Sequence, residues 1–137
     1  MNPIEVVQRA NKAYNGQDAD AFAAAYAEGA TYSNPRAGQG LTGKAIVNYF
    51  KAVWAAYPDA SVELITVGDT GGGLVAAQWV FRGTNTGGTL PDGAPATGRT
   101  VTLPGASFTQ VEGDKIRSEQ IYFDRQVLFE QLGLKAK

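Results

Sequence analysis

Hydrophobic positions in the first part of the chain recur at helical spacing. Ile4, Val7, Ala10 and Tyr14 lie three or four residues apart, which places them on one face of a helix. The preceding NPIE tetrapeptide supplies an N-cap, a first-turn proline and a capping-box acid. Gly16 is a typical C-terminal stop. The pattern therefore predicts a first helix that ends near residue 16.

Two more helices follow. Asp18 can open a second helix with apolar positions at Phe22 and Tyr26, and its end is expected at Gly29. A short strand over 30–33 and a loop over 34–43 come next. Thr42 is the expected cap of a third helix with a wide apolar face, which Pro58 terminates.

After residue 58 the hydrophobic positions no longer recur every three or four residues, as in a helix, but at every second residue, as in a strand. Alternating runs predict strands over 61–67, 74–84, 99–111 and 115–124, joined by turns at 68–73 and 112–114 and by a Gly- and Pro-rich loop over 85–98. Pro104-Gly105 predicts a bulge or a bend within the third of these strands. A short helix ends the chain. This order of elements predicts one α+β domain over 1–137, with helices on one face of a curved sheet.

The last strand has two different faces. Gln120, Tyr122 and Asp124 share a face that mixes polar groups with an aromatic ring, and such a mixture is typical of a cavity wall. Glu119 falls on the opposite face, which becomes apolar toward the end of the strand. Asp124 also precedes the terminal helix and can be its N-cap. The sequence thus allows a catalytic carboxylate, a cap, or both.

Composition restricts the chemistry. The chain of 137 residues has no His and no Cys, which removes Ser-His and Cys-His nucleophiles, imidazole metal ligands and disulfides. Acid–base work must fall to Asp, Glu, Lys or Tyr. The GDTGGG run at 68–73 lacks the ending of a phosphate loop. We therefore expect no metal, flavin, nicotinamide or other cofactor.

Charge and hydropathy bear on partners and location. The formal net charge is -1 and the basic residues are scattered, so no nucleic acid is expected as a partner. The sequence shows neither a membrane-length apolar run nor a signal-peptide pattern. These features predict a cytoplasmic protein with no membrane partner.

Several segments resemble the cone folds of the NTF2-like superfamily. They are ATYSNP at 30–35, LTGKAIVNYF at 41–50 and IYFDRQVLFEQLG at 121–133. Within that superfamily, RGTNTGGTLPDGAPATGR at 82–99 is similar to the SnoaL-like polyketide (ester) cyclases, which read GTHTG and then PTGR; Asn85 replaces their His. The resemblance implies a strongly curved antiparallel or mixed sheet with N-terminal helices on its concave face, and a homodimer.

The resemblance also implies a reaction. Cyclases of this family close a ring by intramolecular aldol condensation without a cofactor, and Asp124 matches the terminal-strand carboxylate that would act as base. Steroid-isomerase-like members share Tyr14 but carry an Asp where this chain has Asn34. Epoxide-hydrolase-like members share a Tyr two residues before Asn34, but their Arg and Asp on the long strand correspond here to Trp79 and Phe81.

The expected site is a cavity for a small hydrophobic or aromatic ligand, with Asp124 as the general base. A non-catalytic small-molecule-binding protein, an isomerase- or epoxide-hydrolase-like enzyme, and an interaction module that uses the outer face of the sheet are the alternatives. The predicted substrate-binding residues are Tyr14, Tyr32, Asn34, Trp54, Trp79, Phe81, Asn85, Phe108, Gln120 and Tyr122.

Overall fold

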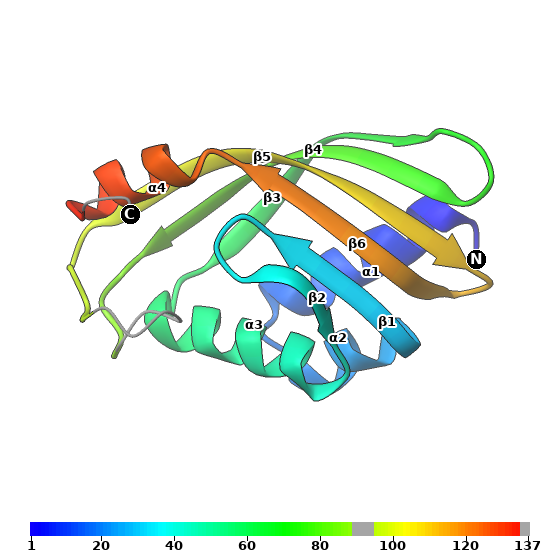
Figure 1. Cartoon of the computed structure of the whole chain (residues 1–137), viewed down its shortest axis with the longest axis horizontal. Coiled ribbons are helices and arrows are strands. Elements are labelled where there is room, and N and C mark those ends of the chain that lie inside the picture. Colours follow the sequence, from blue (N-terminus) through cyan, green and yellow to red (C-terminus); the bar gives the residue numbers. More distant parts are fainter. Residues whose placement is uncertain (89–94, 135–137) are drawn as a thin grey trace.

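The computed structural model describes residues 1–88 and 95–134. These residues form four helices and one six-stranded sheet (Figure 1). The elements are, in order, α1 (Pro3–Asn15), α2 (Ala19–Ala24), β1 (Tyr26–Asn34), β2 (Gly38–Thr42), α3 (Lys44–Ala56), β3 (Ser61–Asp69), β4 (Leu74–Thr84), β5 (Thr100–Glu112), β6 (Lys115–Phe123) and α4 (Arg125–Leu132).

The strands are arranged in the order β2-β1-β6-β5-β4-β3. β1 and β6 pair in parallel, whereas the other neighbours are antiparallel, so the sheet is mixed. The sheet curves around α1, α2 and α3, while α4 lies against β5 near one end (Figure 1). The predicted α+β fold, with a curved mixed sheet and N-terminal helices on its concave side, is confirmed.

The first helix begins as its sequence predicts. The Asn2 side chain accepts a hydrogen bond from the Glu5 backbone, and the Glu5 carboxylate accepts one from the Asn2 backbone. This reciprocal capping box satisfies two donors that the helix itself cannot pair. The helix buries its Val7, Ala10 and Tyr14 face toward the sheet, which fixes Tyr14 above the concave surface.

Aromatic rings fill much of the space between the helices and the sheet. Phe22 lies 4.8 Å from Phe50 and 5.9 Å from Trp54, ring centre to ring centre. Tyr14 contacts the same three rings edge to face, at 5.7 to 6.2 Å. Edge-to-face pairs add stability beyond the area that they bury. This cluster holds α1, α2 and α3 together as one wall of the interior.

Two predicted boundaries are wrong. The second helix ends at Ala24, not at Gly29, and Tyr26 already belongs to β1. Its ring still packs 5.2 Å from that of Phe22, so the apolar spacing imitates a longer helical face across a change of structure. The loop predicted before the third helix contains β2, and that helix begins after Gly43 without a side-chain cap.

The long loop and the predicted bulge also differ from expectation. Residues 89–94 of the loop predicted over 85–98 lie outside the described residues. No bulge occurs at Pro104-Gly105, because the β4–β5 pairing runs unbroken from Thr100 to Gln110. The register shift in this part of the sheet lies between Gln110 and Val111, against β6. Among the described helices, none combines the length and the apolar content needed to cross a membrane.

Candidate functional site

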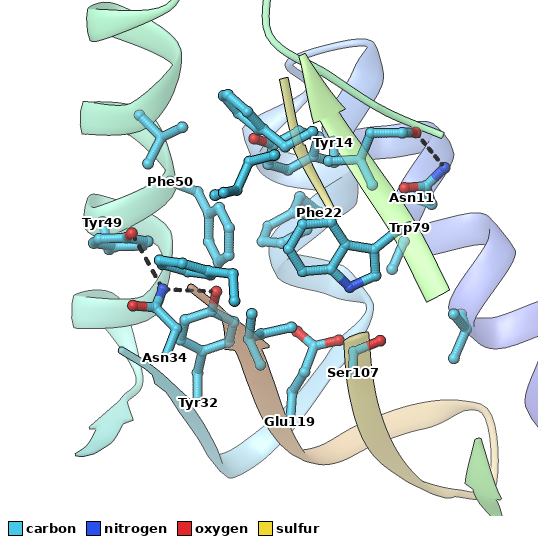
Figure 2. A pocket seen from close by; sticks show the side chains of 18 of the residues that line it. Asn11, Tyr14, Phe22, Tyr32, Asn34, Tyr49, Phe50, Trp79, Ser107 and Glu119 are labelled. Carbon is cyan, nitrogen blue, oxygen red and sulfur yellow. Dashed lines mark hydrogen bonds between the residues drawn. The ribbon is translucent and has the colours of Figure 1, made fainter. Parts of the chain in front are cut away.

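A cavity of about 170 Å³ lies between the concave face of the sheet and the helices (Figure 2). Its wall draws on α1, α2, α3, α4 and on every strand except β2, and most of its residues are aromatic or aliphatic. Glu119 contributes a carboxylate to this wall and Arg36 a guanidinium. A concave, mainly apolar space with a few polar groups is the usual form of a small-molecule site.

Glu119 is held on both carboxylate oxygens. The Tyr26 hydroxyl donates to Oε1 at 2.7 Å and the Thr109 hydroxyl donates to Oε2 at 3.0 Å. Burial raises the pKa of Glu119 above its usual range, and the two hydrogen bonds limit that rise. A raised pKa makes this carboxylate a stronger base than an ordinary Glu, which favours a role in accepting a proton.

Strand pairing explains the position of Glu119. Its partner on β5 is Thr109 and its parallel neighbour on β1 is Tyr32. Paired residues project to the same face of a sheet, so all three side chains point to the concave side. Thr109 is almost fully buried there, which brings its hydroxyl against the carboxylate.

A second polar group in the wall is centred on Asn34. Its Oδ1 accepts from the backbone amides of Arg36 and Ala37, at 2.8 and 2.6 Å, which fixes the orientation of the amide. Its Nδ2 therefore donates to the hydroxyls of Tyr32 and Tyr49, at 3.0 and 3.1 Å (Figure 2). All four hydrogen-bonding positions of the side chain are used, so Asn34 positions two hydroxyls and has no capacity left for a ligand.

The structure places half of the predicted substrate-binding residues in the cavity wall. The expected face of the long strand β4 is the one that faces the cavity. Burial raises the pKa of Tyr14 and that of Tyr32 well above the ordinary range, so both hydroxyls stay protonated at neutral pH. The residues in the wall are Tyr14, Tyr32, Asn34, Trp79 and Phe81.

Asp124 does not line the cavity, so its expected position is wrong. The residue is exposed, and its Oδ1 accepts from the backbone amides of Gln126 and Val127 at 2.9 and 3.2 Å. These are the contacts of an N-cap, and they direct the carboxylate to the end of α4. Of the two roles that the sequence allows for Asp124, the structure contains the cap.

The faces of β5 and β6 are the reverse of those expected. Phe108 and Tyr122 are 44% and 54% exposed and pack against each other on the outer face, with ring centres 6.0 Å apart. Gln120 is exposed on the same side. Since neighbouring residues of a strand point to opposite faces, Glu119 and Ile121 face the cavity instead. Hydrophobicity alone assigns the wrong face to the cavity here, because the exposed outer face carries the large rings of Phe108 and Tyr122.

Two other predicted residues, Trp54 and Asn85, lie outside the cavity wall and stabilise the fold. Trp54 packs in the aromatic cluster behind the wall and does not line the cavity. Asn85 is fully buried, donates to the Ala56 carbonyl at 3.0 Å, and accepts from the backbone and the hydroxyl of Thr97 at 2.8 and 3.0 Å. These bonds tie the start of the loop to the end of α3, so Asn85 has no atom directed to the cavity.

The sequence reasoning missed Glu119, Tyr26, Ser107 and Tyr49. Glu119 was assigned to the core face, and the alternation alone contains no sign of its two hydroxyl partners, which are 10 and 93 residues away in the chain. A charged residue next to Ile121 and Phe123, where that face becomes apolar, is the signal that was available. In the described residues no group of three acidic side chains is close enough to hold a metal ion.

Comparisons with known proteins define the family. The model of the SnoaL-like domain matches residues 7–119. The chain belongs to this family. Solved structures with the same NTF2-like, ketosteroid isomerase-like fold agree, and the predicted family and fold are thereby confirmed. A comparison with curated protein sequences gave no match.

Three solved structures illustrate the range of these relatives. IdmH from Streptomyces antibioticus, a candidate polyketide cyclase, is 22% identical, with a TM-score of 0.83 over 98% of this chain and 100% of its own. A candidate SnoaL-like polyketide cyclase from Jannaschia sp. CCS1 is 17% identical, with a TM-score of 0.84 over 98% and 93%. An LEH-like epoxide hydrolase from M. tuberculosis is 17% identical, with a TM-score of 0.74 over 95% and 88%. At these identities the likeness concerns the fold.

Proposed function

We propose that this SnoaL-like chain is a cofactor-independent enzyme that removes a proton from a small hydrophobic carbonyl compound, with Glu119 as the general base. The observation that carries the proposal is a carboxylate of raised pKa in the wall of a mainly aromatic cavity. Perturbed carboxylates in clefts are common at sites of acid–base catalysis. The enolate formed in this way can then attack a second carbonyl, as in a cyclase, or be reprotonated elsewhere, as in an isomerase.

The cavity volume indicates the size of the substrate. A dry cavity of about 150 Å³ accommodates benzene, and the cavity here is about 170 Å³. A compound with one ring and a carbonyl group fits this space, whereas a fused polyketide of several rings would have to extend beyond it. The proposal is therefore proton abstraction from a one-ring ketone or a compound of similar size.

The hydroxyl groups in the wall support the same chemistry. The Tyr32 hydroxyl accepts from Asn34, so its own proton is directed elsewhere. Raised tyrosine pKa values keep these protons in place, and a fixed donor stabilises negative charge as it develops on an oxygen. The competing function is binding without reaction, which is favoured by the fact that both Glu119 oxygens already accept hydrogen bonds from the protein.

Deuterium exchange distinguishes the two functions. The probes are cyclohexanone, acetophenone and phenylacetone in D₂O, followed by proton NMR of their α-hydrogens. The proposal predicts exchange above the buffer rate for at least one probe, and a fall of roughly 100-fold in Glu119→Gln, the usual scale for loss of a general base. Exchange at the buffer rate for all three, or equal exchange in the variant, would favour a binding protein.

A further inference from the structure

Three mostly buried side chains in the cavity wall carry a polar atom that makes no hydrogen bond within the described residues and is not closed off from the cavity. Trp79, Ser107 and Tyr14 are 9%, 6% and 7% exposed, and all three line the cavity. Within the described part of the chain, none of their side-chain N–H or O–H groups makes a hydrogen bond. In a mainly apolar cavity a few open polar groups usually set the orientation of the ligand, so these three donors are the candidates for that role.

The sheet register makes Ser107 a neighbour of Glu119 and Trp79 a neighbour of Ser107. Ser107 pairs with Ile121 on β6, two residues from Glu119. Ser107 also pairs with Ala77 on β4, two residues from Trp79. Diagonal neighbours on one face lie within reach of long side chains. Trp79, Ser107 and Glu119 therefore follow one diagonal across β4, β5 and β6, whereas Tyr14 comes from α1 on the opposite wall.

Gly105 fixes the orientation of the indole. It pairs with Trp79 across β4 and β5, and a Cβ at this position would lie 2.3 Å from a carbon of the six-membered ring. The ring thus occupies the space above the glycine. Figure 2 shows the indole nitrogen on the edge of the ring that faces Ser107 and Glu119. The Trp79 N–H is thus directed to the part of the wall that also holds Ser107 and Glu119.

We infer that Trp79 Nε1–H and Ser107 Oγ–H bind the carbonyl oxygen of the ligand and hold its α-carbon at Glu119. The inference rests on the proposed function for the role of Glu119, but the oxygen site itself requires only binding. It defines the ligand class as a one-ring compound with a carbonyl acceptor, and it makes Trp79 and Ser107 the residues that select for that acceptor.

Two probes of nearly the same shape test the oxygen site. In α-methylstyrene a CH₂ group replaces the oxygen of acetophenone. Calorimetric titration of the wild-type protein should give a Kd for acetophenone about tenfold lower, which corresponds to about 1.4 kcal/mol. The preference should disappear in Ser107→Ala and in Trp79→Phe. Ser118→Ala and Trp54→Phe are matched controls outside the cavity wall, and they should keep it.

Three results would overturn the inference. They are equal Kd values for the two probes in the wild-type protein, a preference unchanged in both Ser107→Ala and Trp79→Phe, and absence of binding of either probe at millimolar concentration. If Tyr14→Phe alone abolished the preference, the oxygen would bind to the opposite wall. A preference that depends on Ser107 without any deuterium exchange would support the oxygen site and contradict the proposed function, so the two can fail separately.

Discussion

Replacing Glu119 by Gln should change how the stability of the protein depends on pH. Gln has the shape of Glu and stays neutral. Its oxygen can accept from Tyr26, and its amide can donate to the Thr109 hydroxyl in place of the bond that Glu119 accepts. The variant therefore keeps the local contacts and removes only the titration. Any pH-dependent difference between the two proteins then comes from Glu119.

The sign follows from the direction of the pKa shift. Burial raises the pKa of Glu119 above the usual 4.5, so between 4.5 and the folded-state pKa the folded protein holds a proton that the unfolded chain has lost. The free energy of unfolding of the wild type falls as pH rises through this window. Below this pH window the difference in free energy of unfolding between the wild type and Glu119→Gln should be constant. Above the window the stability of Glu119→Gln relative to the wild type should be higher than below it, by about 1.4 kcal/mol for each unit by which folding raises the Glu119 pKa.

Urea unfolding from pH 4 to pH 8, followed by circular dichroism, measures this difference. Tyr26→Phe provides a second point, because it removes the 2.7 Å hydrogen bond to Oε1. That hydrogen bond lowers the pKa of Glu119, so the folded-state pKa should rise further in this variant and the fall in stability should extend to higher pH. A difference between wild type and Glu119→Gln that is constant from pH 4 to pH 8 would refute a raised pKa.

Three further predictions concern packing, capping and assembly. Gly105→Ala should lower the free energy of unfolding by about 1 to 3 kcal/mol, because the new methyl group meets the Trp79 ring; an unchanged urea midpoint would contradict this orientation of the indole. Asp124→Ala should cost about 1 kcal/mol and Asp124→Asn close to nothing, by the same assay; equal losses would argue against the cap. The exposed Phe108–Tyr122 pair on the outer sheet face favours the homodimer predicted from the sequence, and sedimentation of only a 14.4 kDa species at micromolar concentration would count against it.

Local signals in the sequence predict most of the helices and the face of one strand. The capping box at Asn2 and the alternation of β4 depend on neighbours within a few residues, and both occur in the structure as predicted. The strand β2 was not expected, because its GQGLT sequence has no clear alternation and it forms by pairing with β1. Propensity is a weak guide where pairing decides the structure.

The site was harder to predict because its polar groups meet only through the sheet register. Thr109 and Ser107 look like solvent-facing residues of β5, yet they are buried, while Phe108 between them is exposed. A slip of one residue in the assignment exchanges the two faces of a strand, and this exchange placed Asp124 in the cavity and Glu119 in the core. The parallel pairing of β1 with β6, which brings Tyr32 beside Glu119, leaves no local trace in the sequence.

The most direct test of the account compares Glu119→Gln with Asp124→Asn in the same deuterium-exchange assay, on whichever ketone probe the wild-type protein exchanges. Both variants replace a carboxylate by the matching amide, and Asn can still cap α4. If Glu119 is the base, its variant should lose roughly 100-fold in kcat/KM, whereas Asp124→Asn should stay within about twofold of the wild type because its carboxylate lies outside the cavity. A large loss in Asp124→Asn with near-normal exchange in Glu119→Gln would contradict the account.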